Sequence, residues 1–256
     1  MRIVIKIGTS TLAYAGGRLN IRHTEELVKT FSDLKNAGHE IILVSSGAIG
    51  MGAGKLQIDR PTDMATKQAA ASVGQCELMY TYDRLFTEYN HTVAQILVTR
   101  EDFNSPTRLM NLENTLYRLL QLGAIPIINE NDSVATEEIS VGDNDTMGAL
   151  VAKYMRADLL VLLSDIDGLY TADPHTHPEA ELISNVPEIT PQVEALAGGA
   201  GSKLGTGGMA TKIMAAKLAT SAGVDMVIAN GANALVLYDI VAGRPVGTRF
   251  AGRARR

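Results

Sequence analysis

The sequence LGTGGMATK, residues 204–212, indicates how this chain is organised. Gly205, Gly207 and Gly208 leave the backbone free to bring bare N–H groups against a ligand. A helical pattern of apolar residues follows directly, so unpaired N–H groups and the positive end of the helix dipole converge on the loop. Lys212 lies in or next to the first turn of that helix, where a cation is unfavourable unless an anion offsets it. The stretch therefore predicts a phosphate-binding loop.

Other interpretations of this stretch, and of a similar pattern elsewhere in the chain, fit the sequence less well. Residues 205–210 fit the dinucleotide pattern G-x-G-x-x-G/A, but that pattern follows a strand directly, and LAGGAGSK (residues 196–203) cannot form one. A flexible loop before an ordinary helix is the plainest alternative. A P-loop is not formed at Lys55, because Ile49 stands where its first glycine belongs and Leu56 where Ser or Thr belongs. A nucleotide site in this chain is therefore of another kind.

Composition bounds the class of protein. The chain has 256 residues, 46% hydrophobic and 20% charged, which is ordinary for a globular α/β domain. Its net charge of −5 argues against a nucleic-acid partner, apart from an arginine-rich tail that we interpret as a solvated end. No apolar run approaches ~18 residues and no signal peptide opens the chain, so we expect a cytoplasmic protein without membrane contact. The single cysteine, Cys76, suits a reducing compartment and is predicted to be a small core residue.

Short apolar runs alternate with amphipathic, helix-length segments. The runs, rich in Val, Ile and Leu on both faces, predict parallel strands at 2–7, 40–45, 92–98, 124–128, 158–163 and 225–229. Helices are predicted between them at 21–37, 63–89, 105–122, 146–155, 208–222 and 234–241, the first with Asn20 as N-cap and Gly38 just past its end. We find no internal repeat or linker. The predicted fold is α/β, a three-layer α-β-α sandwich with a mainly parallel central sheet, in a single domain covering residues 1–256.

The carboxyl ends of the predicted strands carry glycines and short polar residues. Ligands of open parallel sheets bind at those ends, so segments 6–10, 45–48, 129–132, 164–165 and 230–231 predict one shared site. Lys6 interrupts a strand that should be central and buried, and a buried lysine needs an anion or a carboxylate beside it. The alternative is an inward-pointing lysine on an edge strand.

An acidic stretch, NENDSVATEEISVGDND, spans residues 129–145. Near a phosphate site, these groups could hold Mg²⁺, hold a cationic group of the substrate, or orient the lysines, and a solvated acidic loop is the plainer interpretation. A calcium loop starting at Asp143 fails, because Met147 and Tyr154 stand at ligand positions. His175 and His177 lie in a proline-flanked loop and are interpreted as surface residues rather than as members of a nucleophilic triad.

Several of these segments together resemble one known family. They are VIKIGTS (4–10), SSGAI (45–49), INENDSVA (128–135), VGDND (141–145), LLSDIDGLYTADP (162–174) and GTGGMATK (205–212). Spread in order along nearly the whole chain, they resemble the amino acid kinase family. INEND, VGDND and GTGGM.TK are together typical of the members that phosphorylate free glutamate.

The resemblance implies a role for each matched residue. Lys6 and Lys212 would act on the transferring phosphoryl group, and Asp145 would hold both lysines in place. Ser46, Asp132 and Asn144 would bind L-glutamate. ATP would be bound by Lys6, Gly8, Ser164, Asp165, Thr206, Gly207, Gly208, Met209, Ala210, Thr211 and Lys212, with Ser164 replacing the threonine common in the family. Mg²⁺ would be held mainly through the ATP phosphates rather than by protein ligands.

The implied reaction is transfer of the ATP γ-phosphoryl group to the side-chain carboxylate of L-glutamate. That carboxylate, with a pKa of ~4.3, is already ionised at neutral pH, so no general base is needed. The product would be L-glutamyl 5-phosphate, in the first step of proline biosynthesis. Two alternatives remain open: a kinase of another carboxylate such as N-acetylglutamate, or a sensor that binds amino acid or nucleotide without turnover.

The resemblance also implies partners. Proline would act as a feedback inhibitor, the enzyme would be a homodimer or homotetramer, and it would be coupled to glutamyl phosphate reductase. Many bacterial members carry a C-terminal PUA domain, an RNA-binding type of module. We expect this chain, which stops at Arg256, to lack it.

Overall fold

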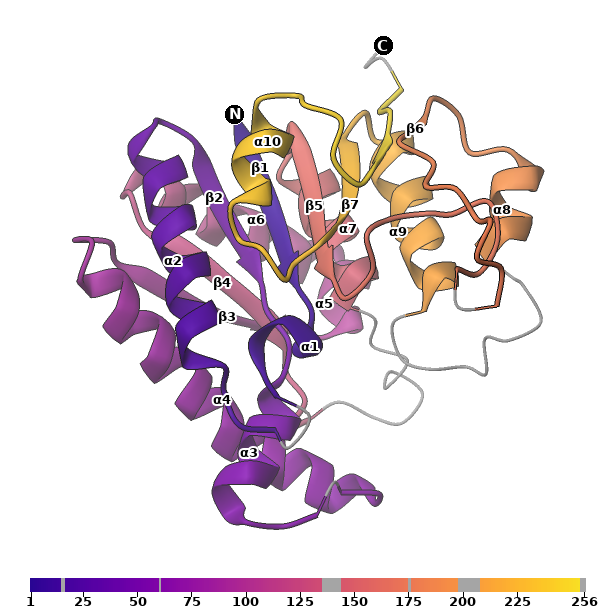
Figure 1. Ribbon diagram of the computed structural model, residues 1–256. Coiled ribbons are helices and arrows are strands. Elements are labelled where there is room, and N and C mark those ends of the chain that lie inside the picture. Colours follow the sequence, from indigo (N-terminus) through magenta and orange to yellow (C-terminus); the bar gives the residue numbers. More distant parts are fainter. Residues whose placement is uncertain (15–16, 60, 135–143, 175, 198–207, 254–256) are drawn as a thin grey trace.

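The computed structural model describes residues 1–14, 17–59, 61–134, 144–174, 176–197 and 208–253 (Figure 1). Within these ranges the strands form one eight-stranded sheet in the order β3-β4-β2-β1-β5-β7-β8-β6. Neighbouring strands are parallel except for the antiparallel pair β7 and β8. The strands are β1 (Arg2–Ile7), β2 (Glu40–Val44), β3 (Val93–Val98), β4 (Ile125–Glu130), β5 (Leu159–Ser164), β6 (Asn185–Val186), β7 (Asp225–Asn230) and β8 (Thr248–Phe250).

The helices lie between the strands in sequence. They are α1 (Thr9–Leu12), α2 (Ile21–Asn36), α3 (Ala48–Leu56), α4 (Met64–Thr87), α5 (Arg100–Asn104), α6 (Pro106–Gln121), α7 (Asn144–Tyr154), α8 (Pro191–Ala197), α9 (Met209–Ser221) and α10 (Val236–Val241). The six predicted strands and six predicted helices correspond to β1–β5, β7, α2, α4, α6, α7, α9 and α10. The side chain of Asn20 accepts a hydrogen bond from the His23 amide at the start of α2, and Gly38 follows its end at φ 92°. The predicted caps are therefore confirmed.

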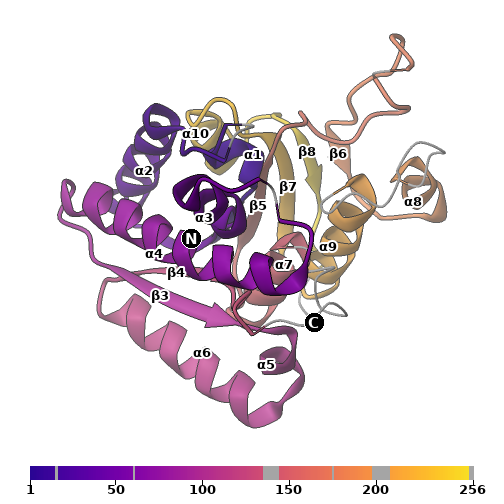
Figure 2. The same ribbon diagram turned by 90° about the horizontal axis from the view of Figure 1, so that it is seen from below.

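Helices cover both faces of the sheet (Figures 1 and 2), which confirms the three-layer arrangement. Alternate residues of each buried strand point to opposite faces. Val4 and Ile128 join the core that α5, α6, α7 and α9 cover. Ile5 and Ile127 join the core beneath α1, α2, α4 and α10. This alternation decides on which face each functional side chain lies.

The strand order reverses at β1, which has β2 on one side and β5 on the other. In open parallel sheets, ligands bind at the carboxyl ends of the strands beside such a switch point. Because β1 is a central strand, the interpretation of Lys6 as an edge lysine is wrong. The carboxyl end of β1 is therefore where the candidate site has to be sought.

The structure differs from the sequence-based expectation at Cys76 and adds detail to the C-terminal tail. Cys76 is exposed on the outer face of α4 rather than buried in the core, because α4 packs through the neighbouring side of the helix. In the C-terminal tail, Arg249 pairs with Asp225, and Arg253 lies 3.7 Å from Glu188, while Arg255 and Arg256 lie outside the described residues. No helix in the described part of the chain is both long and apolar enough to cross a bilayer.

Candidate active site

Three buried charges meet at the carboxyl end of β1. The Lys6 ammonium lies 2.6 Å from Asp145 Oδ1, and the Lys212 ammonium lies 3.0 Å from Asp145 Oδ2. The Asp145 side chain is fully buried, and those of Lys6 and Lys212 are 10% and 3% exposed. Two cations share one carboxylate, so this triad carries a net positive charge. An anion is the group that would complete it.

Three elements deliver the triad to one face of the sheet. Lys6 has the same orientation in β1 as Val4, toward α7 and α9. A Cβ on Gly148 of α7 would lie 3.4 Å from the Lys6 Cβ, so glycine allows α7 to pass close to this lysine. Burial opposes ionisation of Asp145, but Lys6 and Lys212 outweigh it and hold the pKa of Asp145 below its usual range. The carboxylate is therefore ionised at neutral pH.

The helix that follows the glycine-rich loop begins at this triad. Gly208 is the N-cap of α9 and has no side chain to satisfy the first N–H groups of the helix. The Thr211 hydroxyl donates to the Gly208 carbonyl (2.6 Å) and lies 3.4 Å from Asp145 Oδ2. Met209 and Ala210 fall in the same first turn. Thr206 and Gly207, which the family resemblance assigns to ATP binding, lie outside the described residues.

The neighbouring strand ends hold the other residues assigned to ATP. The Gly8 amide donates to the Leu163 carbonyl (3.2 Å), and a Cβ on Gly8 would lie 3.8 Å from the Lys6 ammonium. The backbone at Gly8 thus runs directly beside the triad. Ser164, at the end of β5, donates to Asp165 (3.1 Å) and pairs in register with Asn230 of β7.

A second cluster, adjacent in sequence to the triad, consists of amides and hydroxyls. The Asn144 Nδ2 group donates to the Ser45 carbonyl (2.8 Å), to Ser46 Oγ (2.7 Å) and to Asn129 Oδ1 (3.3 Å). Asn144 Oδ1 is buried and has no hydrogen-bond partner among the described residues. Two of the predicted glutamate-binding residues, Ser46 and Asn144, are therefore in direct contact, and an acceptor remains open beside them.

Asp132 and Glu130 supply acidic groups at the end of β4. Burial raises the pKa of Asp132 to about 6. Burial, with the Asp132 charge adding to it, raises the pKa of Glu130 to about 7. For both carboxyl groups, the loss of hydration on burial is the main cause of the raised pKa. Glu137, Glu138 and Asp143, from the same acidic stretch, lie outside the described residues.

Two polar residues of α4 that contact this region were not predicted from the sequence. Gln75 of α4 accepts a hydrogen bond from Asn129 Nδ2 (2.8 Å), and Tyr82 of α4 lies 3.1 Å from Ser45 Oγ. Burial raises the pKa of Tyr82 above its usual range, so its hydroxyl stays neutral. The sequence does contain a signal for Gln75. It lies at helical spacing with Ala71, Leu78 and Tyr82 on the buried face of α4, and it is the one residue of the four with a side-chain amide.

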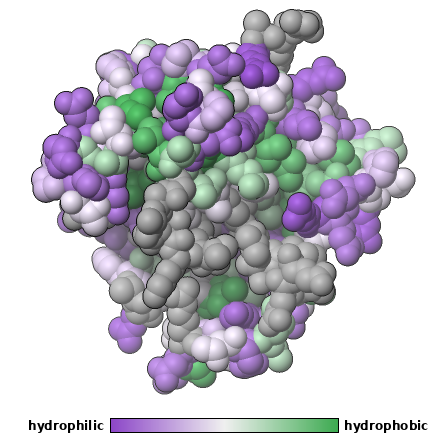
Figure 3. Space-filling view, turned by 90° about the vertical axis from the view of Figure 1, so that its right-hand side faces the viewer, coloured by the Kyte–Doolittle hydropathy of each residue, from purple (hydrophilic) through white to green (hydrophobic). Residues whose placement is uncertain are grey.

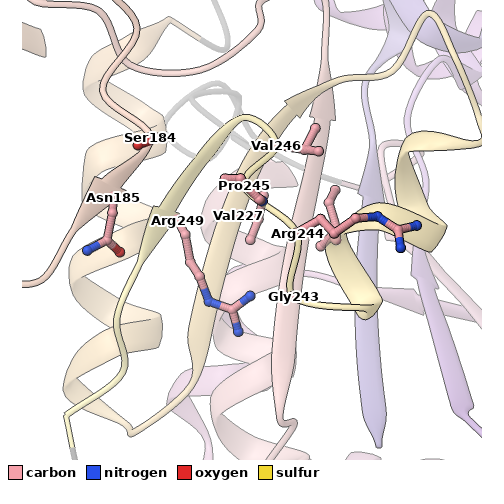
Figure 4. A pocket seen from close by; sticks show the side chains of 9 residues that line it. Ser184, Asn185, Val227, Gly243, Arg244, Pro245, Val246 and Arg249 are labelled. Carbon is pink, nitrogen blue, oxygen red and sulfur yellow. The ribbon is translucent and has the colours of Figure 1, made fainter.

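Other features of the molecule do not compete with this region. No cluster of three or more His, Cys, Asp or Glu side chains able to hold a metal is found among the described residues. A pocket of about 180 Å³ lies near the end of the sheet formed by β7, β8 and β6, lined in part by Arg244 and Arg249 (Figure 4). Both arginines are already paired, with Asp239 and Asp225, and ligand pockets usually have ~300 Å³ or more. His177 lies in an exposed loop and contacts Glu179 (3.0 Å).

A buried cationic pair at a switch point of a parallel sheet, next to a polar amide cluster, is the arrangement expected of a phosphotransferase site in a three-layer α/β protein. The sequence profile of the amino acid kinase family matches residues 1–230. The chain belongs to the amino acid kinase family.

Curated relatives cover nearly the whole chain. Glutamate 5-kinase of Clostridium tetani is 55% identical over 97% of this chain and 93% of its own length. Glutamate 5-kinase of Listeria innocua is 52% identical over 98% of this chain and 93% of its own length.

Solved structures show the same fold at low identity. Carbamate kinase from Giardia lamblia bound to AMP-PNP has a TM-score of 0.71 at 15% identity, covering 98% of each chain. Isopentenyl phosphate kinase of T. acidophilum has a TM-score of 0.66 at 17% identity, covering 98% of this chain and all of its own. These likenesses concern the fold alone and confirm the predicted amino acid kinase fold.

Proposed function

We propose that this protein phosphorylates the side-chain carboxylate of L-glutamate with ATP, giving L-glutamyl 5-phosphate. The observation that carries the proposal is the Lys6–Asp145–Lys212 triad beside the Asn144 amide cluster. The triad offers surplus positive charge to a phosphoryl group, and the cluster offers an open acceptor to an ammonium. The curated relatives, at 49–55% identity, are named glutamate 5-kinases.

The triad suits the demands of phosphoryl transfer. The substrate carboxylate is already ionised at neutral pH, so the protein has to supply position and charge rather than a base. Lys6 and Lys212 would stabilise negative charge on the transferring group, and Asp145 would hold both ammonium groups in place. Because all three side chains are buried, little water competes with them.

The chain's own residues fit ATP and leave Mg²⁺ to the nucleotide. The uncapped start of α9 at Gly208 presents N–H groups near the cationic triad, and the missing side chain at Gly8 leaves room beside the Lys6 ammonium, which suits a polyphosphate. Bound Mg²⁺ would supply further neutralisation of phosphate charge. We assign Ser164, Asp165 and residues 206–212 to ATP on the family resemblance, and we assign no protein side chain to the metal.

The substrate comparison that separates this function from its nearest alternative is glutamate against N-acetylglutamate. The free α-ammonium of glutamate would pair with Asp132 and with Asn144 Oδ1, whereas acetylation replaces it with a bulkier neutral amide. We expect kcat/KM to be ~10²-fold or more higher for glutamate, because the acetylated substrate leaves half-buried Asp132 without its cation. Comparable use of N-acetylglutamate, measured by coupled ADP release on one preparation, would show that the substrate assignment is wrong.

The acidic pKa values predict a pH dependence. Asp132, whose pKa is raised to about 6 by burial, loses its charge as the pH falls through that value. We expect kcat/KM for glutamate to fall over the same pH range in the wild type and to fall much less in Asp132→Asn. At pH 8, we expect Asp132→Asn to raise the KM for glutamate far more than the KM for ATP. Since kcat/KM reports the free enzyme, its pH profile is the measurement.

Protein stability provides the control for this profile. Raised carboxylate pKa values mean that protons bind the folded protein more tightly, so Asp132 and Glu130 make it more stable as the pH falls. A melting temperature that drops together with activity between pH 8 and 6 would attribute the effect to unfolding instead.

Proline, the end product of the proposed pathway, shares the α-carboxylate and α-nitrogen arrangement of glutamate. We expect proline to compete with glutamate at or beside Asp132 and Asn144, within the amino acid kinase domain itself. The test is the initial rate at low glutamate with saturating proline, and an unchanged rate would refute this proposal.

The remaining assignments rest on the family resemblance. We propose a single amino acid kinase domain over residues 1–256, a homodimer or homotetramer, cytoplasmic location, and functional coupling to glutamyl phosphate reductase.

Hydrophilic residues cover much of the outer rim on the side of the molecule that carries α8 and α9 (Figure 3).

A further inference from the structure

A chain of three side-chain amides runs across the ends of the central strands. Asn144 Nδ2 donates to Asn129 Oδ1 (3.3 Å), and Asn129 Nδ2 donates to Gln75 Oε1 (2.8 Å). The direction of this chain is fixed at Asn144, whose Nδ2 group also donates to the Ser45 carbonyl (2.8 Å), a group that can only accept. Each amide is thereby oriented by the one before it.

The fixed direction leaves two different groups open at the two ends. Asn144 Oδ1 is an acceptor and Gln75 Nε2 is a donor, and both are buried without a hydrogen-bond partner in the described part of the chain. The Gln75 residue is only 9% exposed. Buried polar groups are normally paired, so each end calls for a complementary group. An α-amino acid supplies both, with an ammonium for the acceptor and a carboxylate for the donor.

The Gln75 end of the chain lies toward the face of the sheet that α4 covers. Asn129 has the same orientation in β4 as Ile125 and Ile127, toward the face that α4 covers. Lys6 points to the other face, toward α7 and α9. A carboxylate that receives a phosphoryl group has to lie beside Lys6 and Lys212. A carboxylate at Gln75 is therefore the other one, the α-carboxylate.

The surroundings of Gln75 favour a negative charge. A Cβ on its neighbour Gly74 would lie 1.8 Å from the Ala48 carbonyl oxygen, so α4 is packed directly on the first turn of α3. The N-cap of α3, Gly47, makes no side-chain hydrogen bond to that turn. The first turn of α3 is thus in contact with the turn of α4 that carries Gln75, and its dipole adds a positive end to this region.

We propose that Gln75 is a further substrate-binding residue, whose Nε2 group donates a hydrogen bond to the α-carboxylate of the bound amino acid. This rests on the proposed function, since it takes glutamate as the substrate. A different role is open to the same residue: Gln75 could serve only as an acceptor that holds Asn129. The two roles make opposite demands on a glutamate side chain at this position.

The test compares Gln75→Glu with Gln75→Met on two substrates, L-glutamate and its α-amide, isoglutamine. Gln75→Glu keeps an acceptor for Asn129 but replaces the donor with a charge that repels a carboxylate. We expect it to raise the KM for glutamate roughly ten- to hundredfold, more than Gln75→Met does, with kcat and the KM for ATP little changed. With isoglutamine, whose amide can donate to the new carboxylate, the penalty of Gln75→Glu should shrink or disappear.

The matched control is Gln121→Glu, the same chemical change at an exposed residue at the end of α6, which should leave every constant unchanged. Near wild-type kinetics of Gln75→Glu, or an equal penalty on both substrates, would overturn the proposal. Thermal unfolding checks that each variant folds. Should Gln75→Glu not fold, Gln75→Met alone decides, because an equal penalty on glutamate and isoglutamine contradicts donation to the α-carboxylate.

Turnover of glutamate by the wild-type protein is measured first. A failure of the proposed function therefore shows in the wild type, whereas a failure of the Gln75 assignment shows only in the variants.

Discussion

Replacing either lysine of the proposed active site, Lys6 or Lys212, with alanine is expected to lower kcat by ~10²-fold or more. Lys6 and Lys212 are held in place by Asp145, so they can act on charge that develops during transfer without first reorganising. Removing one of them leaves Asp145 paired with the other, so the buried site stays compensated and the fold should persist. The measurement is kcat by coupled ADP release at saturating ATP and glutamate.

The matched control is Lys217→Ala. Lys217 lies on α9 with Lys212, but its side chain is 46% exposed and pairs with Glu194 at the surface. We expect no more than a small change in kcat for this variant, since exposed ion pairs contribute little. A Lys6→Ala or Lys212→Ala protein that melts like the wild type and keeps its kcat would remove these lysines from the mechanism.

Asp145→Asn is expected to impair both stability and activity. The substitution leaves two buried ammonium groups close together without their shared carboxylate. Removing one partner of a buried ion pair typically costs roughly 3–5 kcal/mol. Because the lysines would also lose their positions, kcat should fall by ~10²-fold or more. Chemical denaturation and steady-state kinetics on the same preparation measure the two effects.

Asp239→Asn is the matched control for this charge removal. Asp239 pairs with Arg244 at the surface, where its side chain is 42% exposed, so we expect a change of less than about 1 kcal/mol. Equal stability losses in Asp145→Asn and Asp239→Asn would contradict the view that the buried triad depends on its carboxylate. Because the two lysines lower the pKa of Asp145 despite its burial, its contribution to stability should persist until the pH falls below the usual aspartate range.

The parallel sheet was predictable because its strands are apolar on both faces. β1 and β5 match the prediction within a residue at each end. α3 was not predicted, because Ala48–Leu56 is rich in glycine, which disfavours a helix. The short strands β6 and β8 were not predicted either. Pairing at the sheet edge, rather than local pattern, defines these two strands.

The candidate site was predictable only in part. Lys6 stood out because a lysine in a buried strand needs a partner, but its partner could not be deduced from spacing alone. The family resemblance, rather than the acidic composition of residues 129–145, singled out Asp145. Gln75 could not be singled out because its proposed role depends on contact with Asn129, 54 positions away in the sequence. Cys76, beside it, was wrongly expected in the core, because a one-residue step around a helix turns a side chain from the packed face toward solvent.

Chemical capture of the product tests the central claim most directly. The protein is incubated with ATP, Mg²⁺ and L-glutamate in the presence of hydroxylamine, which converts an acyl phosphate into a hydroxamate. The account predicts that ADP and glutamyl 5-hydroxamate form in equal amounts, and that neither forms without glutamate. ADP release that is independent of glutamate, or ADP formed from glutamate with no hydroxamate, would contradict phosphorylation of the side-chain carboxylate.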